Sequence, residues 1–359
     1  MILLTILKSG SQQTEFVIEL FRHGARKPKA FMSEYNPSDR ENGMDLSITG
    51  MRNHYFLGSL TKKKYEYFFQ NSVRPWTTHI AVSSTNRTIS SAISNFIGLS
   101  KSYLKIETPF HKDLWTPPNV NNFEKSTNLH SLPNQIQFHP LDIQGKKTNF
   151  IFHSRKVCPL IKKLYKKQLD NAYQKLKNKF NSSYLVFENL GYDPKSMFKN
   201  GRQWSTKNLL ELMDMYRCNL FNSKSTKWTY ESKLHMEVLL AIKTFARVSN
   251  QNLTRIRLFS LYKDWLDKIQ QFLDSKGNTL RFAQYSAHNN NLSLVLYDLF
   301  GKSDLNCMIN QYQIHLQNQK ISSKEDYIKK KQLILKSGCF WFIPFTTSIF
   351  IEVYSDSKV

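Results

Sequence analysis

The stretch "EFVIELFRHGARKP" at residues 15–28 begins as an almost continuous apolar run and ends in two arginines around a histidine. An apolar run of this length is typical of a strand that is buried on both faces of a sheet. Residues 46–60 follow with helical spacing, residues 78–84 again resemble a strand, and residues 85–98 again resemble a helix. This repeated order of strand, turn and helix predicts an α/β sheet covered by helices.

The middle of the chain has a different pattern. Between about residues 155 and 250, long segments repeat leucine and isoleucine at three- and four-residue spacing among lysines, which is typical of helices with one buried face. Strand-like segments return only afterwards. We therefore predict a helix over 261–277, a strand over 278–287, a helix over 289–301 and strands within 336–355.

Together these segments predict an α/β fold, a three-layer sandwich with a mainly parallel central sheet plus an all-α inserted cap domain. The 359 residues are enough for one large domain or two. We predict a discontinuous core formed by residues 12–112 and 255–359, with a mainly helical insertion at 113–254.

The chain is strongly basic, with 51 lysines and arginines against 27 acidic residues and a formal net charge of +24. Such an excess attracts polyanions, including nucleic acids, anionic membranes and polyphosphorylated metabolites. It also arises from a lysine-rich surface without a specific partner, and the lysines here are widely spread and accompany no nucleic-acid-binding motif. We expect no nucleic-acid partner, and steering of an anionic substrate if the charge has a function.

Few features of the sequence indicate a compartment. The first ten residues contain a short apolar run without a basic start, so an incomplete or atypical signal peptide remains one reading. No run reaches the roughly 20 apolar residues of a membrane span, and we predict none. The cysteines allow two disulfides in any of three pairings and lack the close spacing of a metal site; they are Cys158, Cys218, Cys307 and Cys339.

The polar residues at the end of the first predicted strand suit the binding of a phosphoryl group. Ligand sites of open α/β sheets lie beyond the carboxyl ends of the strands, where Arg22, His23 and Arg26 fall. Guanidinium groups hold phosphate oxygens with paired hydrogen bonds, while a neutral imidazole nitrogen can face phosphorus. Gly24 would let the backbone approach the anion closely. The pattern R-H-G-x-R-x-P should recur by chance in on the order of one chain of this length in ten thousand.

Several segments together resemble the histidine acid phosphatases. The stretch "FRHGARKP" resembles the signature of this family, and "LSITGMRNHYFLG" at residues 46–58 resembles its L-T-x-x-G-x-x-x-H-x-x-L-G helix. The segments "VSSTNRTISSA", "YSAHNNNL" and "IPFTTSIFIEVY" resemble its S-T…R-T segment, its S-A-H-D segment and its late strand region. The resemblance covers nearly the whole chain and implies a two-domain acid phosphatase.

This resemblance implies hydrolysis of phosphomonoesters in two steps. His23 would attack phosphorus to form a phosphohistidine, and water would then release phosphate. The nonbridging oxygens would be bound by Arg22, Arg26, Arg87 and His288. Neither a metal ion nor another cofactor is expected, because arginines would supply the positive charge. The implied partner is a small phosphorylated, and in one reading polyanionic, substrate, and the implied location is secreted or lysosomal.

One residue departs from the family pattern. The family places an acid after its second histidine to protonate the leaving alkoxide, and this chain has Asn289 there. An amide cannot supply that proton, whereas general acid catalysis typically contributes about 10²–10⁴-fold. Asparagine would still serve as the cap of the following helix. Two hypotheses follow: an acid phosphatase weakened on alkyl phosphates, or a pseudophosphatase that binds phosphorylated ligands without useful turnover. The more distant Asp298 and Asp304 are not expected to replace the acid.

Overall fold

A computed structural model gives the fold. It describes residues 3–4, 14–28, 43–69, 77–100, 139–177, 181–189, 206–222, 229–275, 280–300, 305–316, 319–338 and 343–354. The strands are β1 (Leu3–Leu4), β2 (Thr14–Arg22), β3 (Thr78–Ser83), β4 (Asp142–Gln144), β5 (Phe282–Ala287) and β6 (Ser348–Tyr354). The helices of the first half are α2 (Ile48–Lys64), α3 (Glu66–Phe69), α4 (Asn86–Ser100), α5 (Phe150–Val157), α6 (Pro159–Lys177) and α7 (Asn181–Asn189). Those of the second half are α9 (Thr206–Phe221), α10 (Tyr230–Ala246), α11 (Gln251–Asp274), α12 (Asn289–Phe300), α13 (Leu305–His315) and α14 (Lys324–Lys336).

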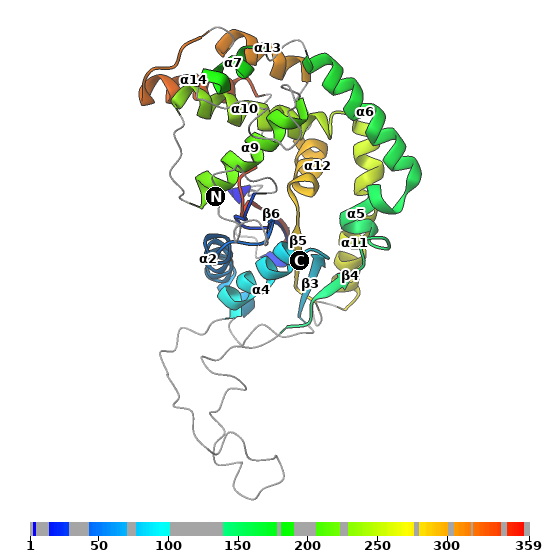
Figure 1. The fold of residues 1–359 in the computed structure, drawn as a ribbon. Helices are drawn as coiled ribbons and strands as arrows, with labels where there is room; N and C mark the ends of the chain where they lie inside the picture. The colour runs from blue at the N-terminus through cyan, green and yellow to red at the C-terminus, as the bar shows by residue number, and fades with distance from the viewer. Residues whose placement is uncertain are drawn as a thin grey trace, which may run out of the picture.

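The described strands form one six-stranded sheet in the order β1-β6-β2-β5-β3-β4 (Figure 1). The pairs β2–β5, β5–β3 and β3–β4 are parallel, whereas β6 runs antiparallel to β2. Arg22 at the end of β2 is in register with Ala287 at the end of β5, and Val82 of β3 is in register with Ser286. The carboxyl ends of these three strands therefore meet at one edge of the sheet.

Helices cover both faces of the sheet. On one face, Val17 and Phe21 of β2 share a buried cluster with Leu57 of α2 and Phe96 of α4. On the other face, alternate residues of β2 join a larger buried cluster that includes Trp265 of α11. Successive side chains of a strand point to opposite faces, so the apolar run of β2 is buried on both. The predicted α/β sandwich with a mainly parallel sheet and a helical region is confirmed.

The remaining helices pack mainly on one another. Figure 1 shows α9, α10, α13 and α14 at the top of the molecule, above the sheet, and α10 contacts α9, α13 and α14. Short polar side chains cap several of these helices; the hydroxyl of Thr229, for example, accepts a hydrogen bond from the backbone amide of Ser232 at the start of α10. The predicted division at 113–254 is not itself tested by these contacts. Helices after residue 300 nevertheless belong to the same helical layer as α10, and β4 within that range pairs with the sheet.

Several predicted boundaries were wrong. The helix expected over 261–277 begins already at Gln251, and the short α5 and β4 were missed. The segment 336–345 was expected to form a strand, but Lys336 ends α14 and residues 343–345 lie outside any strand; residues 339–342 lie outside the described part. Apolar runs alone do not separate a strand from a buried loop, and tertiary contacts decided this segment.

The helix α2 approaches the strand end through two glycines. A Cβ atom on Gly24 would lie 2.5 Å from the carbonyl oxygen of Gly50, and one on Gly50 would lie 2.1 Å from that of Ala25. The amide of Gly24 donates to the hydroxyl of Ser91 at 3.1 Å. Helix packing thus explains the glycine after His23, and the close approach of an anion to the backbone that the sequence suggested stays a prediction.

Two further features concern membrane spans and the cysteines. Within the described residues no helix is both long and apolar enough to cross a bilayer. Cys307 is disulfide-bonded, whereas Cys158 and Cys218 are free; Cys339 lies outside the described residues.

Candidate active site

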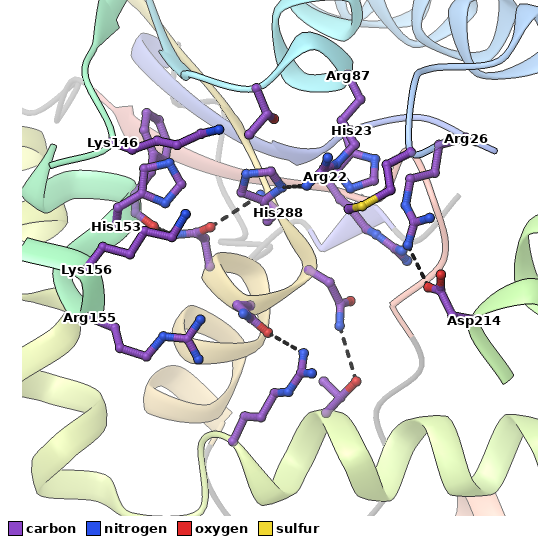
Figure 2. A pocket seen from close by; sticks show the side chains of 18 of the residues that line it. Arg22, His23, Arg26, Arg87, Lys146, His153, Arg155, Lys156, Asp214 and His288 are labelled. Atoms are coloured by element: carbon purple, nitrogen blue, oxygen red, sulfur yellow. Dashed lines mark hydrogen bonds and ion pairs between the residues drawn. The ribbon is translucent and has the colours of Figure 1, made fainter. Parts of the chain in front are cut away.

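A cavity of about 620 Å³ lies at the carboxyl ends of β2, β3 and β5, beneath α9 and α10. Figure 2 shows His288 in its centre, with His23 and the arginines Arg22, Arg26 and Arg87 on one side. All residues that the sequence predicted for the site line this cavity: Arg22, His23, Arg26, Arg87, His288 and Asn289. Segments far apart in the chain therefore meet where the parallel strands end, as open α/β sheets arrange their ligand sites.

His23 is held as a neutral imidazole with one free nitrogen. Its Nδ1 lies 2.9 Å from the carbonyl oxygen of Gly24, which can only accept, so Nδ1 carries the proton and donates it. The unprotonated Nε2 keeps its lone pair. His23 is only 4% exposed. Burial, followed by the charges of Arg22 and His288, holds the pKa of His23 well below its usual value. The ring is therefore ready to act as a nucleophile even in mildly acidic solution.

Arg22 is fixed by contacts on the edge and the face of its guanidinium group. Its Nη1 donates to the carbonyl oxygen of Ile343 at 2.5 Å, and the guanidinium carbon lies 4.0 Å from the ring centroid of Phe345. Its buried Nε has no hydrogen-bond partner among the described residues. Burial and the charges of Arg217 and Arg26 lower the pKa of Arg22. A bound dianion would satisfy these unpaired donors and offset the repulsion between the arginines.

Arg26 has an acidic partner that the sequence did not predict. Its Nη2 donates to Oδ1 of Asp214 in α9 at 2.6 Å, and its Nη1 donates to the carbonyl oxygen of Lys27 at 2.8 Å (Figure 2). Burial alone would lower the pKa of Arg26, but the Asp214 carboxylate raises it above its usual value. Asp214 therefore orients Arg26, and an anion that bound to Arg26 would have to compete with this carboxylate. No motif pointed to Asp214, because it lies in a helix of the middle segment, far from the strand ends in sequence.

Arg87 and His288 begin a chain of hydrogen bonds. Nη2 of Arg87 lies 3.4 Å from Nδ1 of His288. The other ring nitrogen of His288, Nε2, lies 2.9 Å from the hydroxyl of Ser83. This hydroxyl also lies 3.0 Å from Nε2 of His153 in α5. A guanidinium group can only donate, so Nδ1 of His288 accepts and its Nε2–H donates to Ser83. Burial and neighbouring cations hold the pKa of His288 well below normal and lower that of His153 to about 4. His153 was missed, because a single histidine on a helix gives no sequence signal.

Asn289 is bound to the helical layer. It is the first residue of α12, and its Nδ2 donates to the hydroxyl of Thr244 in α10 at 3.2 Å. The expectation that its side chain caps the helix was wrong, because the side chain reaches across to α10. Its Oδ1 is buried and has no partner within the described residues. Asp298 does not line the cavity; it accepts hydrogen bonds from Arg255 and Tyr262. Asp304 lies outside the described residues.

The wall of the cavity is strongly cationic. Among the described residues it contains two acids, Asp45 and Asp214, against seven arginines and three lysines: Arg22, Arg26, Arg87, Arg155, Arg217, Arg247, Arg257, Lys146, Lys156 and Lys243. Figure 2 shows Lys146, Arg155 and Lys156 on the side of His153, across the cavity from Arg26. A cavity this basic favours ligands with several negative charges over those with one.

The chain was compared with proteins of known family and structure. Residues 39–359 match the family described as histidine phosphatase superfamily (branch 2); this range includes Arg87, His288 and Asn289 but not His23. A stretch of 92 residues is 33% identical to prostatic acid phosphatase of Bos taurus and spans 25% of this chain and 24% of that protein. The match thus spans about a quarter of the length of this curated relative.

Solved structures share the fold at low sequence identity. The phytase of Klebsiella sp. ASR1 has a TM-score of 0.55 at 12% identity, over 97% of this chain and 81% of the phytase. The multiple inositol polyphosphate phosphatase of Bifidobacterium longum, in complex with inositol hexasulfate, has a TM-score of 0.54 at 11% identity, over 98% of this chain and 84% of that enzyme. Because the family match extends over most of its length, the chain belongs to the histidine phosphatase superfamily, branch 2.

Proposed function

We propose that the protein is a phosphomonoester hydrolase of the acid phosphatase type that works through a phosphohistidine at His23. One observation carries this proposal: the Nδ1–H of His23 is bound to the Gly24 carbonyl, which leaves the lone pair of Nε2 free in a cavity lined by Arg22, Arg87 and His288. A neutral nucleophile among guanidinium groups is the arrangement that attack on a phosphate dianion requires.

The first step forms a bond between Nε2 of His23 and phosphorus while the bond from phosphorus to the leaving oxygen breaks. Arg22, Arg26 and Arg87 bind the nonbridging oxygens and stabilise the charge that develops on them. In the second step water attacks the phosphohistidine, inorganic phosphate leaves, and His23 is again neutral.

His288 assists through the chain of hydrogen bonds to Ser83 and His153. When phosphate takes over Arg87, Nδ1 of His288 loses its donor. The Ser83 hydroxyl would then rotate, and the rings of His288 and His153 would change tautomer by exchanging protons with solvent. In this arrangement Nδ1–H of His288 donates to the phosphate. His153 would stabilise this second arrangement by donating from Nε2 to Ser83.

The substrate we propose carries more than one phosphate or other anionic group. The cationic side chains extend from Arg26 across the cavity to Lys146, Arg155 and Lys156, farther than one phosphate requires. Two structures with the same fold are a phytase and an inositol polyphosphate phosphatase, which agrees with a polyanionic substrate.

The alternative is a pseudophosphatase. Asn289 stands where the family has its proton donor, and binding of phosphate does not need that donor. Such a protein would bind phosphorylated ligands in the same cavity without useful turnover.

Assays with an aryl and an alkyl phosphate on the wild type, His23→Ala and Asn289→Asp separate the two functions. Aryl leaving groups need little protonation, so we expect aryl turnover that His23→Ala abolishes. If no other residue of the cavity donates the proton, Asn289→Asp should raise alkyl turnover, by up to about 10²-fold. His315→Ala, at the end of α13 and outside the cavity, is the matched control. If the wild type binds phosphate but shows no His23-dependent turnover of either substrate, the protein is a pseudophosphatase.

We also propose that the protein is secreted or lysosomal. The disulfide at Cys307 supports an oxidising compartment, as does the partial similarity to prostatic acid phosphatase. Expression with and without secretion, followed by comparison of activity and of the Cys307 redox state, tests this location.

A further inference from the structure

The proposed phosphatase reaction lacks a proton donor at Asn289, and the same cavity contains another residue that can carry a proton. Helix α10 turns one face toward the cavity, formed by Leu240, Lys243, Thr244 and Arg247, at the spacing of adjacent helical turns. Lys243 is thus a cationic side chain of the helical layer that reaches the same cavity as His23 and His288.

Two hydrogen bonds fix this face of α10 to the start of α12. Thr244 accepts from Nδ2 of Asn289 at 3.2 Å, and Nη1 of Arg247 donates to Oδ1 of Asn290 at 3.0 Å. Lys243 precedes Thr244 on this helix and lines the same cavity as Asn289, the position at which the family pattern has its acid. A leaving group bound in this cavity therefore has both Asn289 and Lys243 on the surrounding wall.

The ammonium group of Lys243 is available to a substrate. Within the described residues it forms no hydrogen bond and no ion pair, although its side chain is mostly enclosed. Charged groups face it from Arg247 on its own helix, from Asp214 and Arg217 on α9 and from Arg26 after β2. The first two residues of α12, Asn289 and Asn290, line the same cavity and are neutral.

This environment brings the acidity of the lysine into a useful range. Burial, followed by the charge of Arg247, lowers the pKa of Lys243 to about 7. An acid of this pKa is protonated in mildly acidic solution and still gives up its proton readily, which is the condition for efficient general acid catalysis. A bound phosphate dianion would raise this pKa again and keep the ammonium form in the complex.

We propose that Lys243 is the proton donor to the leaving group, in the role that Asn289 cannot fill; this rests on the proposed phosphatase function. As the bond between phosphorus and the leaving oxygen breaks, Nζ of Lys243 gives one proton to that oxygen, and an alcohol departs. The neutral amine then takes a proton from the water that attacks the phosphohistidine. Phosphate leaves, and the ammonium group is restored.

The two acids of the cavity are less suited to this role. Asp214 is bound to Arg26 at 2.6 Å, and this ion pair already occupies its carboxylate. Asp45 lies near Arg87, to which it contributes a favourable charge interaction, and it belongs to the segment before α2, not to the wall formed by α10 and α12.

The test compares Lys243→Met and Lys243→Arg with the wild type on p-nitrophenyl phosphate and on an alkyl phosphate such as β-glycerophosphate. Arginine keeps the positive charge but does not release a proton at these pH values, so it separates proton donation from charge. Lys233→Met, on the same helix but away from the cavity, is the matched control.

We expect both Lys243 variants to lower the ratio of alkyl to aryl kcat by about 10²-fold or more. The limb of the alkyl kcat/KM profile that falls above pH of about 7 should disappear. The double variant Lys243→Met with Asn289→Asp should regain alkyl turnover, because the carboxylic acid then supplies the proton. This rescue also shows that the variant still folds.

Two outcomes overturn the proposal. The first is an unchanged alkyl to aryl ratio in Lys243→Arg. The second is a wild type that hydrolyses aryl but not alkyl phosphates, which would mean that no residue donates the proton. Failure of the phosphatase function itself is distinct from both, because aryl turnover that depends on His23 would then be missing in every variant.

Discussion

The hydroxyl of Ser83 lies 2.9 Å from Nε2 of His288 and fixes the orientation of this ring at the end of β5. Ser83→Ala leaves Nε2 without its partner and lets the ring rotate. We predict that kcat for an aryl phosphate falls roughly ten- to hundredfold, because the donor to the phosphate is misplaced, while KM changes little. Imidazole ¹⁵N shifts of His288 should show an altered tautomer. Unchanged shifts and an unchanged kcat would mean that Ser83 has only a packing role.

Asp214 binds Nη2 of Arg26, so under the proposed function it competes with phosphate for this nitrogen. Asp214→Asn removes the competing charge, and we predict that inorganic phosphate inhibits on the order of tenfold more strongly at low salt. The gain should shrink as ionic strength rises. Because Arg26 also loses its orienting partner, kcat should fall. Weaker inhibition by phosphate in this variant would show that orientation of Arg26 outweighs the competition.

Glu19 makes stability depend on pH. It is fully buried in the middle of β2 and accepts hydrogen bonds from Gln284 and Ser348. Burial raises the pKa of Glu19 from 4.5 to about 7. Between pH 4.5 and about pH 7, Glu19 is therefore protonated in the folded state but ionised in the unfolded state. The stabilisation is complete below pH 4.5 and is lost as the pH rises to about 7, a difference on the order of 3 kcal/mol.

Glu19→Gln tests this linkage by chemical denaturation at several pH values. We predict that the variant is more stable than the wild type at pH 8 and that much of the stability loss between pH 5 and pH 7 disappears. A pH dependence equal to that of the wild type would show that other groups cause it.

The cysteines should differ in their reactions with thiol reagents. Cys218 is fully buried, and burial raises the pKa of its thiol to about 12 against the lowering effect of the nearby arginines, so it should react only on unfolding. Cys158 is partly exposed and should react in the folded protein. Cys307 should react only after reduction. Peptide mapping of the labelled protein checks this order, and labelling of Cys307 without reductant would contradict it.

Much of the site could be predicted from the sequence, for a physical reason. A short apolar run followed by Arg22 and His23 marks the carboxyl end of a buried strand, and "YSAH" before Asn289 marks another. Parallel strands bring such ends together, so the residues meet without any knowledge of the helices. The parallel order of β2, β5 and β3 confirmed that part of the fold.

The partners from the helices could not be predicted in this way. Asp214, Lys243 and His153 reach the cavity because of how α9, α10 and α5 pack above the sheet. An amphipathic pattern shows which face of a helix is buried but not which residue at the edge of that face meets the site. The helices α13 and α14 were missed for a related reason, because the polar and apolar residues of α13 and the lysines and apolar residues of α14 follow no clear periodic pattern.

The central claim is that Nε2 of His23 becomes covalently bound to phosphorus. The most direct test is rapid quenching of the wild type with p-nitrophenyl phosphate, followed by peptide mass spectrometry under alkaline conditions that preserve phosphohistidine. We predict a phosphoryl group on the peptide that contains His23 during turnover, and none in His23→Ala. Turnover without any phosphorylated His23, or phosphorylation of another residue in its place, would contradict the account.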